Sequence, residues 1–405
     1  MQDNEKKPAL RFKGFTDPWE QRKLGDITVE LSEYATQELG LPLLTSSRSG
    51  LMYQDEYRDS RTTKSTETLF SVVPVGTCTY RHMSDDDVFH MNINTLEKGL
   101  VSREYPVFEA SKGNNLEFLV QHINSSEEFK AFCAEQKKGG TRTRLYYNTL
   151  CQFTVRVPAL KEQAQISQCL KKLDTLITLH QRKYEKLVNI KKSMLDKMFP
   201  QNGVSVPEIR FKGFTDPWEQ RKLGELSRSF EYGLNVAAKE YDGQNKYLRI
   251  TDIDDTSRQF VSADITSPDA NLAEADNYRL SDGDVLFART GASVGKTYLY
   301  KKSDGLVYFA GFLIRAKIKE SVSAGFIFQN TLTRSYERYI AITSQRSGQP
   351  GVNAQEYAEY QLMLPELFEQ EKIAKLLEAL DILITLHQRE HIKSILEVKL
   401  VKRNE

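Results

Sequence analysis

The sequence has 405 residues, of which 40% are hydrophobic, 27% charged and 10% aromatic, and its formal net charge is +1. This length allows several domains of about 100 to 200 residues each, and the composition excludes a collagen-like, low-complexity or globally disordered chain. Apolar runs are shorter than the roughly 20 residues of a transmembrane helix, and no secretory signal begins the sequence. Four cysteines without a CxxC pair predict a cytoplasmic protein.

Two segments of the sequence occur twice. RFKGFTDPWEQRKLG occupies residues 11–25 and recurs unchanged at 210–224, which is an offset of 199 residues. DTLITLHQR at 174–182 recurs as DILITLHQR at 381–389, an offset of 207 residues. The sequences between these repeats scarcely resemble one another. The duplication therefore predicts two variable regions inside constant flanks, with pseudo-twofold symmetry and two equivalent surfaces for a partner.

The repeats divide the chain into six segments. Both variable regions contain runs rich in β-branched and aromatic residues between Gly and Asp turns, which predicts α+β domains. The expected segments are a repeated flank at 1–25, a globular region at 26–157, a long helix at 158–199, a linker with the second flank at 200–224, a second globular region at 225–364 and a second long helix at 365–405.

Each long helix carries a hydrophobic seam with steps of three and four residues, as in coiled coils. The seam positions are Ile166, Leu170, Leu173, Ile177, His180, Tyr184, Leu187, Lys191, Met194 and Met198 in the first helix and Ile373, Leu377, Leu380, Ile384, His387 and His391 in the second. The first helix would be roughly 60 Å long. The favoured interpretation is that the helices pair, with His387 near His180; the alternative is that each helix caps the core of its own half.

Two motifs suggest catalysis but depart from their templates. TGASVGKT at 290–297 resembles a nucleotide-binding loop, yet only three residues separate Gly291 from Gly295 where the template has four. HQREH at 387–391 resembles a zinc motif, but both histidines lie on the seam and the first copy reads HQRKY. A stand-alone P-loop NTPase or zinc hydrolase therefore remains the alternative function. We expect no catalytic residue and no metal site.

Basic residues gather in loops of both variable regions. Arg and Lys neutralise phosphates, and Arg and Gln can make bidentate contacts to bases in the major groove. Solvated turns, or a coiled-coil scaffold that binds only protein, are the alternatives. The candidate DNA-binding residues are Lys137, Lys138, Arg142, Arg144, Tyr146, Arg289, Thr290, Lys296, Arg346 and Gln349.

Four motifs on this duplicated plan carry a family resemblance. They are WEQRKLG, GDVLFARTGASVGK, SGQPGVNAQEY and LPELFEQEKIAKLLEALD. Together they resemble the specificity subunit of type I restriction-modification systems over nearly the whole chain. The resemblance implies two target-recognition domains, at 26–157 and 225–364, each of which reads one half of a split site in double-stranded DNA. An antiparallel pair of long helices would separate them.

The resemblance also implies partners and cofactors. The family's subunit is not an enzyme and binds no cofactor; it assembles with two modification subunits that use S-adenosylmethionine and two restriction subunits that use ATP and Mg²⁺. A membrane plays no part. One departure concerns the first variable region, which reads KKGGTRTRLYYN where the second has an RTG hairpin and an SGQ loop. We therefore expect the first recognition domain to be of a different type.

Overall fold

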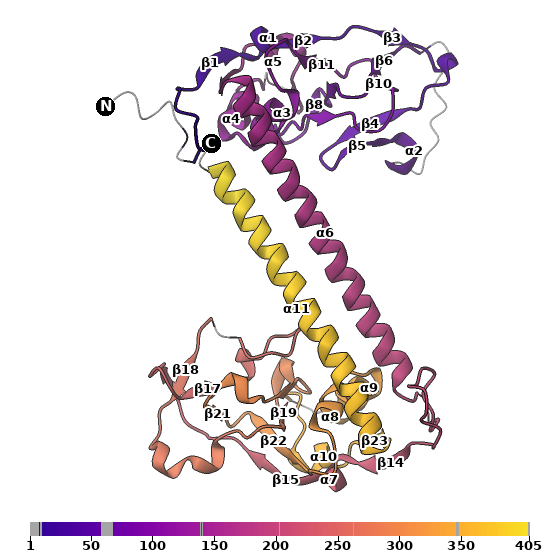
Figure 1. Ribbon diagram of the computed structural model, residues 1–405, viewed down its shortest axis with the longest axis vertical. Coiled ribbons are helices and arrows are strands. Elements are labelled where there is room, and N and C mark those ends of the chain that lie inside the picture. The colour runs from indigo at the N-terminus through magenta and orange to yellow at the C-terminus, as the bar shows by residue number, and fades with distance from the viewer. Residues whose placement is uncertain are drawn as a thin grey trace. The chain divides into compact units, whose positions relative to one another are not determined.

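The computed structural model describes residues 8, 10–57, 68–137, 139, 141–201, 203–261, 263–345 and 348–403, with side chains through residue 397 in the last helix. The chain forms two compact units, Met1–Thr178 with Ile392–Glu405 and Leu179–His391. The long helices α6 (Leu160–Met198) and α11 (Leu367–Arg403) each contribute to both units (Figure 1). Within the described residues, no helix is both long and apolar enough to cross a membrane.

The first unit contains a mixed set of short strands and helices before α6. Its strands are β1 (Glu20–Lys23), β2 (Thr28–Glu30), β3 (Tyr34–Ala35), β4 (Leu44–Ser47), β5 (Gly50–Tyr53), β6 (Phe70–Val73), β7 (Cys78–Thr79), β8 (Met83–Ser84), β9 (Asn92–Ile93), β10 (Gly99–Ser102), β11 (Val107–Ala110), β12 (Thr143–Arg144) and β13 (Thr154–Val157). Its helices are α1 (Leu24–Ile27), α2 (Gln54–Tyr57), α3 (Leu116–Ser125), α4 (Glu127–Glu135) and α5 (Tyr147–Leu150).

The second unit has a similar composition of elements before α11. Its strands are β14 (Glu219–Lys222), β15 (Ser227–Tyr232), β16 (Ala238–Glu240), β17 (Lys246–Leu248), β18 (Thr266–Pro268), β19 (Asp284–Ala288), β20 (Thr297–Leu299), β21 (Val307–Phe309), β22 (Leu313–Ile318) and β23 (Gln361–Leu364). Its helices are α7 (Leu223–Leu226), α8 (Ala324–Asn330), α9 (Arg334–Thr343) and α10 (Ala354–Ala358). The α+β class predicted from the sequence is therefore confirmed.

Each unit contains a four-stranded sheet of its own, and the two sheets have the same strand order although the variable sequences differ. The strand order is β2-β11-β7-β9 in the first unit and β15-β22-β19-β20 in the second. In each unit a separate two-stranded ladder, β1 with β13 or β14 with β23, joins the repeated flank to the strand before the long helix. The two regions therefore share a strand order, and the expectation that the first region is of a different type, which rests on its missing RTG hairpin, stays a prediction.

The repeated flanks bind the long helices through the same contacts in both units. Arg11 makes a two-pronged ion pair with buried Glu162, at 2.8 and 2.6 Å, and Arg210 makes the equivalent pair with Glu369, at 2.8 Å for both contacts. A buried carboxylate needs such a charged partner to offset the loss of its hydration. The flank therefore fixes the direction in which each helix leaves its domain.

The glutamine after each of these glutamates makes a second duplicated contact. Gln163 accepts a hydrogen bond from the Asn115 amide at 2.8 Å, and Gln370 accepts one from the Ser323 amide at 2.9 Å. Asn115 and Ser323 are the N-cap residues of α3 and α8. Each glutamine thus connects its long helix to the start of a helix in the variable region.

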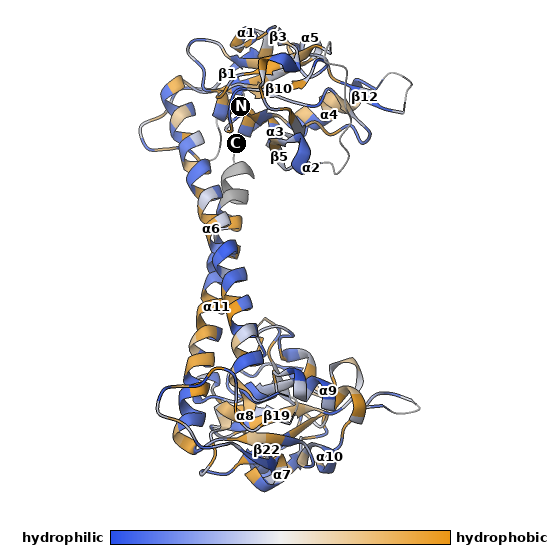
Figure 2. Ribbon diagram, turned by 90° about the vertical axis from the view of Figure 1, so that its right-hand side faces the viewer, coloured by the Kyte–Doolittle hydropathy of each residue, from blue (hydrophilic) through white to orange (hydrophobic). Residues whose placement is uncertain are grey.

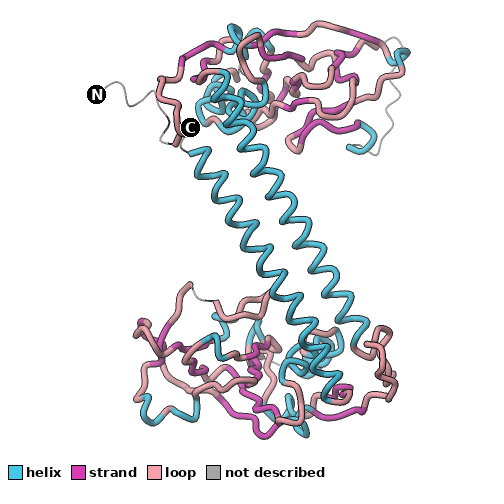
Figure 3. The backbone as a smooth tube through the Cα atoms, viewed as in Figure 1, coloured by secondary structure: helices cyan, strands magenta, loops and turns pink. Residues whose placement is uncertain are grey.

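Inside the second unit, the end of α6 packs against the first half of α11 in the antiparallel direction (Figure 3). The Nδ1 atoms of His180 and His387 lie 3.2 Å apart, and further along Lys191 forms an ion pair with Asp381. The predicted pairing of the helices is therefore confirmed within this unit. The alternative also holds in part, because Ile373 and Leu377 belong to the core of the second variable region.

Candidate nucleic-acid interface

The structure brings together two loops of the second region that the sequence separates. Arg289 and Thr290 directly follow β19. Thr290 forms an antiparallel bridge with Gly351. The Gly291 amide donates to the Pro350 carbonyl at 3.0 Å, and the Val352 amide donates to the Arg289 carbonyl at 2.9 Å. Among the predicted DNA-binding residues, Arg289, Thr290 and Gln349 therefore lie on one edge of the unit.

The glycine of the RTG hairpin has a conformational and a steric role. Gly291 has a φ of +72°, which side-chain-bearing residues rarely adopt. A Cβ atom added there would lie 3.0 Å from the Nε2 atom of Gln349. The absence of a side chain at Gly291 thus gives the Gln349 amide space beside the hairpin.

Two exposed aromatic residues flank Arg289, and sequence reasoning missed both. The Arg289 guanidinium lies over the Tyr232 ring, 5.1 Å from its centroid, and the Arg289 amide donates to the Phe312 carbonyl at 3.1 Å. Tyr232 is 44% exposed and Phe312 is 60% exposed. Stacking on an aromatic face orients a guanidinium while its N–H groups stay in its plane and can still donate. Nothing in the local sequence around these residues distinguishes them from core aromatics.

Lys296 lies away from this exposed edge. Its side chain is buried, and its ammonium donates to the Ile253 carbonyl at 3.0 Å and pairs with Asp255. A phosphate would have to displace these partners, so DNA binding by Lys296 stays a prediction.

The loop resembling a nucleotide-binding motif has its amides occupied. The amides of Val294, Gly295 and Lys296 donate to carbonyl oxygens of the same hairpin at 3.1, 3.0 and 2.9 Å. A phosphate-binding loop needs such amides to point at the ligand. This geometry argues against the P-loop alternative.

The first region contains an equivalent hairpin, formed by β7 and β9 as the RTG hairpin is formed by β19 and β20, and the sequence did not reveal it. Strand β12 pairs with β8, so that Arg144 lies opposite Met83, and the Leu145 amide donates to the His82 carbonyl at 2.8 Å. Tyr146 is 46% exposed and stacks on His82, with ring centroids 5.6 Å apart and planes at 26°. The only sequence signal would have been the TYRHMS segment at 79–84, which lacks the RTG glycine.

Three consecutive aspartates, at 85–87, bind basic side chains near this hairpin. Arg142 pairs with Asp85 at 2.7 Å and Lys137 with Asp87 at 3.7 Å, while Arg48 pairs with Asp86. Exposed ion pairs of this kind contribute about 0 to 1 kcal/mol, so a phosphate could replace the carboxylates at small cost. Within the part of the chain that the structure describes, exposed Arg81 and Arg144 have no such carboxylate partner.

Two of the predicted DNA-binding residues stay predictions. Lys138 and Arg346 lie outside the described residues. The zinc-like motif is part of the helix pair, since His387 faces His180 as predicted. Burial lowers the pKa of His387, and the positive charge of Lys183 adds to the effect. Among the described residues, no group of three or more His, Cys, Asp or Glu side chains could hold a metal ion.

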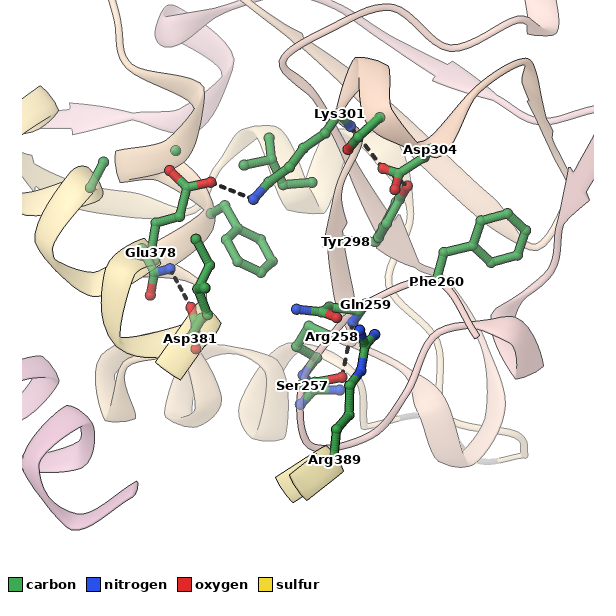
Figure 4. Close-up of a pocket in the computed structure, with 17 residues that line it drawn as sticks. Ser257, Arg258, Gln259, Phe260, Tyr298, Lys301, Asp304, Glu378, Asp381 and Arg389 are labelled. Atoms are coloured by element: carbon green, nitrogen blue, oxygen red, sulfur yellow. Dashed lines mark hydrogen bonds and ion pairs between the residues drawn. The ribbon is translucent and has the colours of Figure 1, made fainter. Parts of the chain in front are cut away.

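A polar pocket of about 310 Å³ lies between α11 and the variable part of the second unit (Figure 4). Several of its polar groups are paired with one another: Lys301 binds Glu378, the Tyr298 hydroxyl donates to Asp304 at 2.7 Å, and Gln329 donates to Asp381 at 3.0 Å. These contacts stabilise the packing of α11 and leave no carboxylate pair arranged for acid–base catalysis.

Comparison with known proteins identifies a family model that matches one segment in each half of the duplicated chain. The model of the type I restriction modification DNA specificity domain matches residues 90–189 and 215–397. The MjaVIII specificity subunit of the type I restriction enzyme from Methanocaldococcus jannaschii is 23% identical over 273 residues, which is 64% of this chain and 63% of that protein. The crystal structure of a type I restriction-modification system S subunit from M. genitalium has a TM-score of 0.63 at 12% identity and covers 98% of both chains.

Proposed function

Because the chain belongs to the family of type I restriction modification DNA specificity domains, we propose that it is the DNA-binding specificity subunit of a type I restriction-modification complex. The observation that carries this proposal is that the family model matches segments in both halves of the duplicated chain. The chain spans 63% of the length of the curated relative that it matches. The partner subunits of this chain are therefore part of the proposal.

Each variable region reads one half of a bipartite DNA site. The shared sheet order supports equivalent roles for the two regions, and their different hairpins support different half-sites. Arg289 and Gln349 provide the side-chain types that make bidentate contacts to guanine and adenine in the major groove. The exposed cations Arg81 and Arg144 are suited to phosphates, which position a protein on the duplex.

The long helices set the spacer between the half-sites. Modules that read the same face of DNA lie about 34 to 36 Å apart, one helical turn, and a helix with the 39 residues of α6 reaches roughly 60 Å. Four residues inserted into α6 between Thr178 and Leu179, where the chain passes from one unit to the other, add roughly 6 Å of helix. This insertion is expected to lengthen the preferred spacer by about one or two base pairs. An unchanged spacer would contradict this role of the helices.

The helices also dock the two modification subunits. Leu176 and Leu179 on α6 and Leu383 and Leu386 on α11 occupy equivalent positions of the repeat, and all four are exposed. Figure 2 shows hydrophobic stretches along both helices. Exposed apolar side chains on a duplicated element favour two copies of one partner.

The chain itself has no catalytic role in this proposal. Modification subunits supply S-adenosylmethionine and methylate adenine, and restriction subunits supply ATP hydrolysis with Mg²⁺. Since methylation of a base in a duplex requires its extrusion, the partner extrudes the base while this chain fixes the position.

Mapping of DNA methylation in cells tests the proposal. The chain would be expressed with its partner subunits, and residues 26–157 would be exchanged for the corresponding region of another family member. We expect one half of the methylated motif to change and the other half to persist. Exchange of residues 225–364 is the matched control, because it should change the other half only. A motif that survives both exchanges would contradict the proposal.

A further inference from the structure

His82 occupies the place in the first region that Arg289 occupies in the second. The His82 carbonyl accepts from the Leu145 amide at 2.8 Å, and the Arg289 carbonyl accepts from the Val352 amide at 2.9 Å. Residue 289 follows residue 82 by 207 positions, and residue 352 follows residue 145 by the same 207, which is the offset of the helix repeat.

The neighbouring pairs agree with this equivalence. Arg144 lies opposite Met83 in the first region, and Gly351 lies opposite Thr290 in the second. The strand before each hairpin, β7 or β19, is the third strand in the shared sheet order. The ladder pairing and the strand order of the sheet therefore place His82 and Arg289 at the same edge of the same framework.

The two edges present different side chains to solvent. In the second region the Arg289 guanidinium is partly exposed above the Tyr232 ring. In the first region the His82 ring is buried, and the exposed group is the Tyr146 ring stacked on it. Burial lowers the pKa of His82, so that the imidazole is neutral near pH 7. The first edge thus carries an aromatic ring with one hydroxyl where the second carries a cation.

Two exposed cations border the first edge. Arg81 directly precedes His82, and Arg144 lies on β12 two residues before Tyr146. Their guanidinium groups can contact phosphates on either side of an aromatic group that approaches the bases. This arrangement resembles the division of labour between positioning and reading contacts in DNA-binding proteins.

Resting on the proposed function, we propose that Tyr146 is the base-reading residue of the first region and that His82 is its positioning residue. Tyr146 then does in the first half-site what Arg289 does in the second. The chemistry of the two half-sites differs: Arg289 donates two hydrogen bonds to one guanine edge, whereas the Tyr146 ring contacts one base edge through its apolar face and its hydroxyl.

The test is a scan of single base-pair substitutions across both half-sites, with the full chain and a duplex whose motif comes from methylation mapping. A wild-type chain should lose about tenfold in affinity at each contacted pair. Tyr146→Leu should abolish discrimination at one position of one half-site and leave the other half-site unchanged. Arg289→Lys should do the same at one guanine of the other half-site, because lysine cannot make the bidentate contact.

His82 is tested by loss and rescue. His82→Ala should affect the same single position as Tyr146→Leu, and His82→Phe, which keeps a ring beneath Tyr146, should restore discrimination there. Tyr34→Leu is the matched control, since Tyr34 is equally exposed in the same unit but belongs to the sheet formed by β10, β6 and β3. It should leave every position unchanged.

The outcomes separate this inference from the proposed function. If Tyr146→Leu lowers discrimination at every position of its half-site alike, or at none, the base-reading role of Tyr146 is overturned while the proposed function stands. If His82→Phe fails to rescue, His82 is not a positioning residue. A wild-type chain that discriminates at no position of either half-site overturns the proposed function and this inference with it.

Discussion

The two variable regions share a backbone framework and differ at the edge that it presents. Both have the same four-strand order and the same contacts to the repeated flank and long helix. At the equivalent hairpin, however, one region has Tyr146 on a buried His82 and the other has Arg289 on Tyr232. The comparison teaches that two variable sequences can keep one strand order and the same contacts to the repeated flank and long helix, while the side chains at the edge differ.

The largest expected effect comes from breaking the duplicated ion pairs. Arg210→Ala leaves Glu369 buried without its partner, and loss of one member of a buried pair costs about 3 to 5 kcal/mol. Arg11→Ala should cost the same in the first unit, because Glu162 is equally buried. Denaturant unfolding of both variants checks this. Unequal costs would show that the two frameworks are not equivalent, and Arg210→Met with Glu369→Leu should recover most of the loss.

A smaller effect is expected at the hairpins, where the two regions differ. Gly291→Ala introduces a side chain at a φ of +72° beside Gln349, which costs about 1 to 2 kcal/mol. The equivalent Ser84 has no such backbone conformation, so Ser84→Ala causes no backbone strain and should cost only its hydrogen bond to Asp86, about 0.5 to 1 kcal/mol. Thermal unfolding measures both. Equal costs would remove the proposed difference between the hairpins.

The aspartates at 85–87 allow the first edge to be made more basic. Replacing Asp85 and Asp86 with Asn frees Arg142 and Arg48. Each freed cation that reaches a phosphate should steepen the dependence of log affinity on log salt by about one. Titrations at several salt concentrations measure the slope. An unchanged slope would mean that these cations do not approach DNA. Asp17→Asn combined with Asp216→Asn, at two exposed positions of the repeated flanks, is a control of equal charge change.

The smallest effect concerns pH and the helix pair. Burial lowers the pKa of His387 below its ordinary value of 6.5, so the folded chain keeps the neutral ring while the unfolded chain takes up a proton. The stability of the second unit should therefore be complete above about pH 6.5 and decrease as pH falls towards the folded pKa. His387→Gln should reduce this decrease in melting temperature. An identical pH profile in the variant would contradict the role of His387.

The long helices and their pairing could be predicted from the sequence, because a hydrophobic seam indicates which face of a helix is buried and the repeat shows that both helices have such a face. The helices begin at Leu160 and Leu367, close to the predicted starts at 158 and 365. The pairing of His180 with His387 followed from their shared seam positions. Helical periodicity survives substitution on the solvent side, so these elements leave a clear pattern.

The candidate site was less accessible to sequence reasoning. Arg289 and Gln349 were each identified because their loops are rich in glycine. The sequence did not show that the two loops lie side by side, because this depends on backbone hydrogen bonds between segments about 60 residues apart. His82 was missed because its hairpin is specified by backbone pairing and lacks a glycine signal. The partners of Arg142 and Lys296 were also missed, since tertiary contacts alone bring Asp85 and Asp255 beside them.

The central claim is that the two variable regions are equivalent DNA-recognition domains, and the most direct test is a chain that carries the first variable region twice. Residues 225–364 would be replaced by residues 26–157, and the methylated motif would be mapped with the partner subunits present. Because the two frameworks have the same strand order, the proposed function predicts a motif in which one half-site occurs twice as an inverted repeat. A motif that remains asymmetric, with the original second half-site intact, would contradict the account.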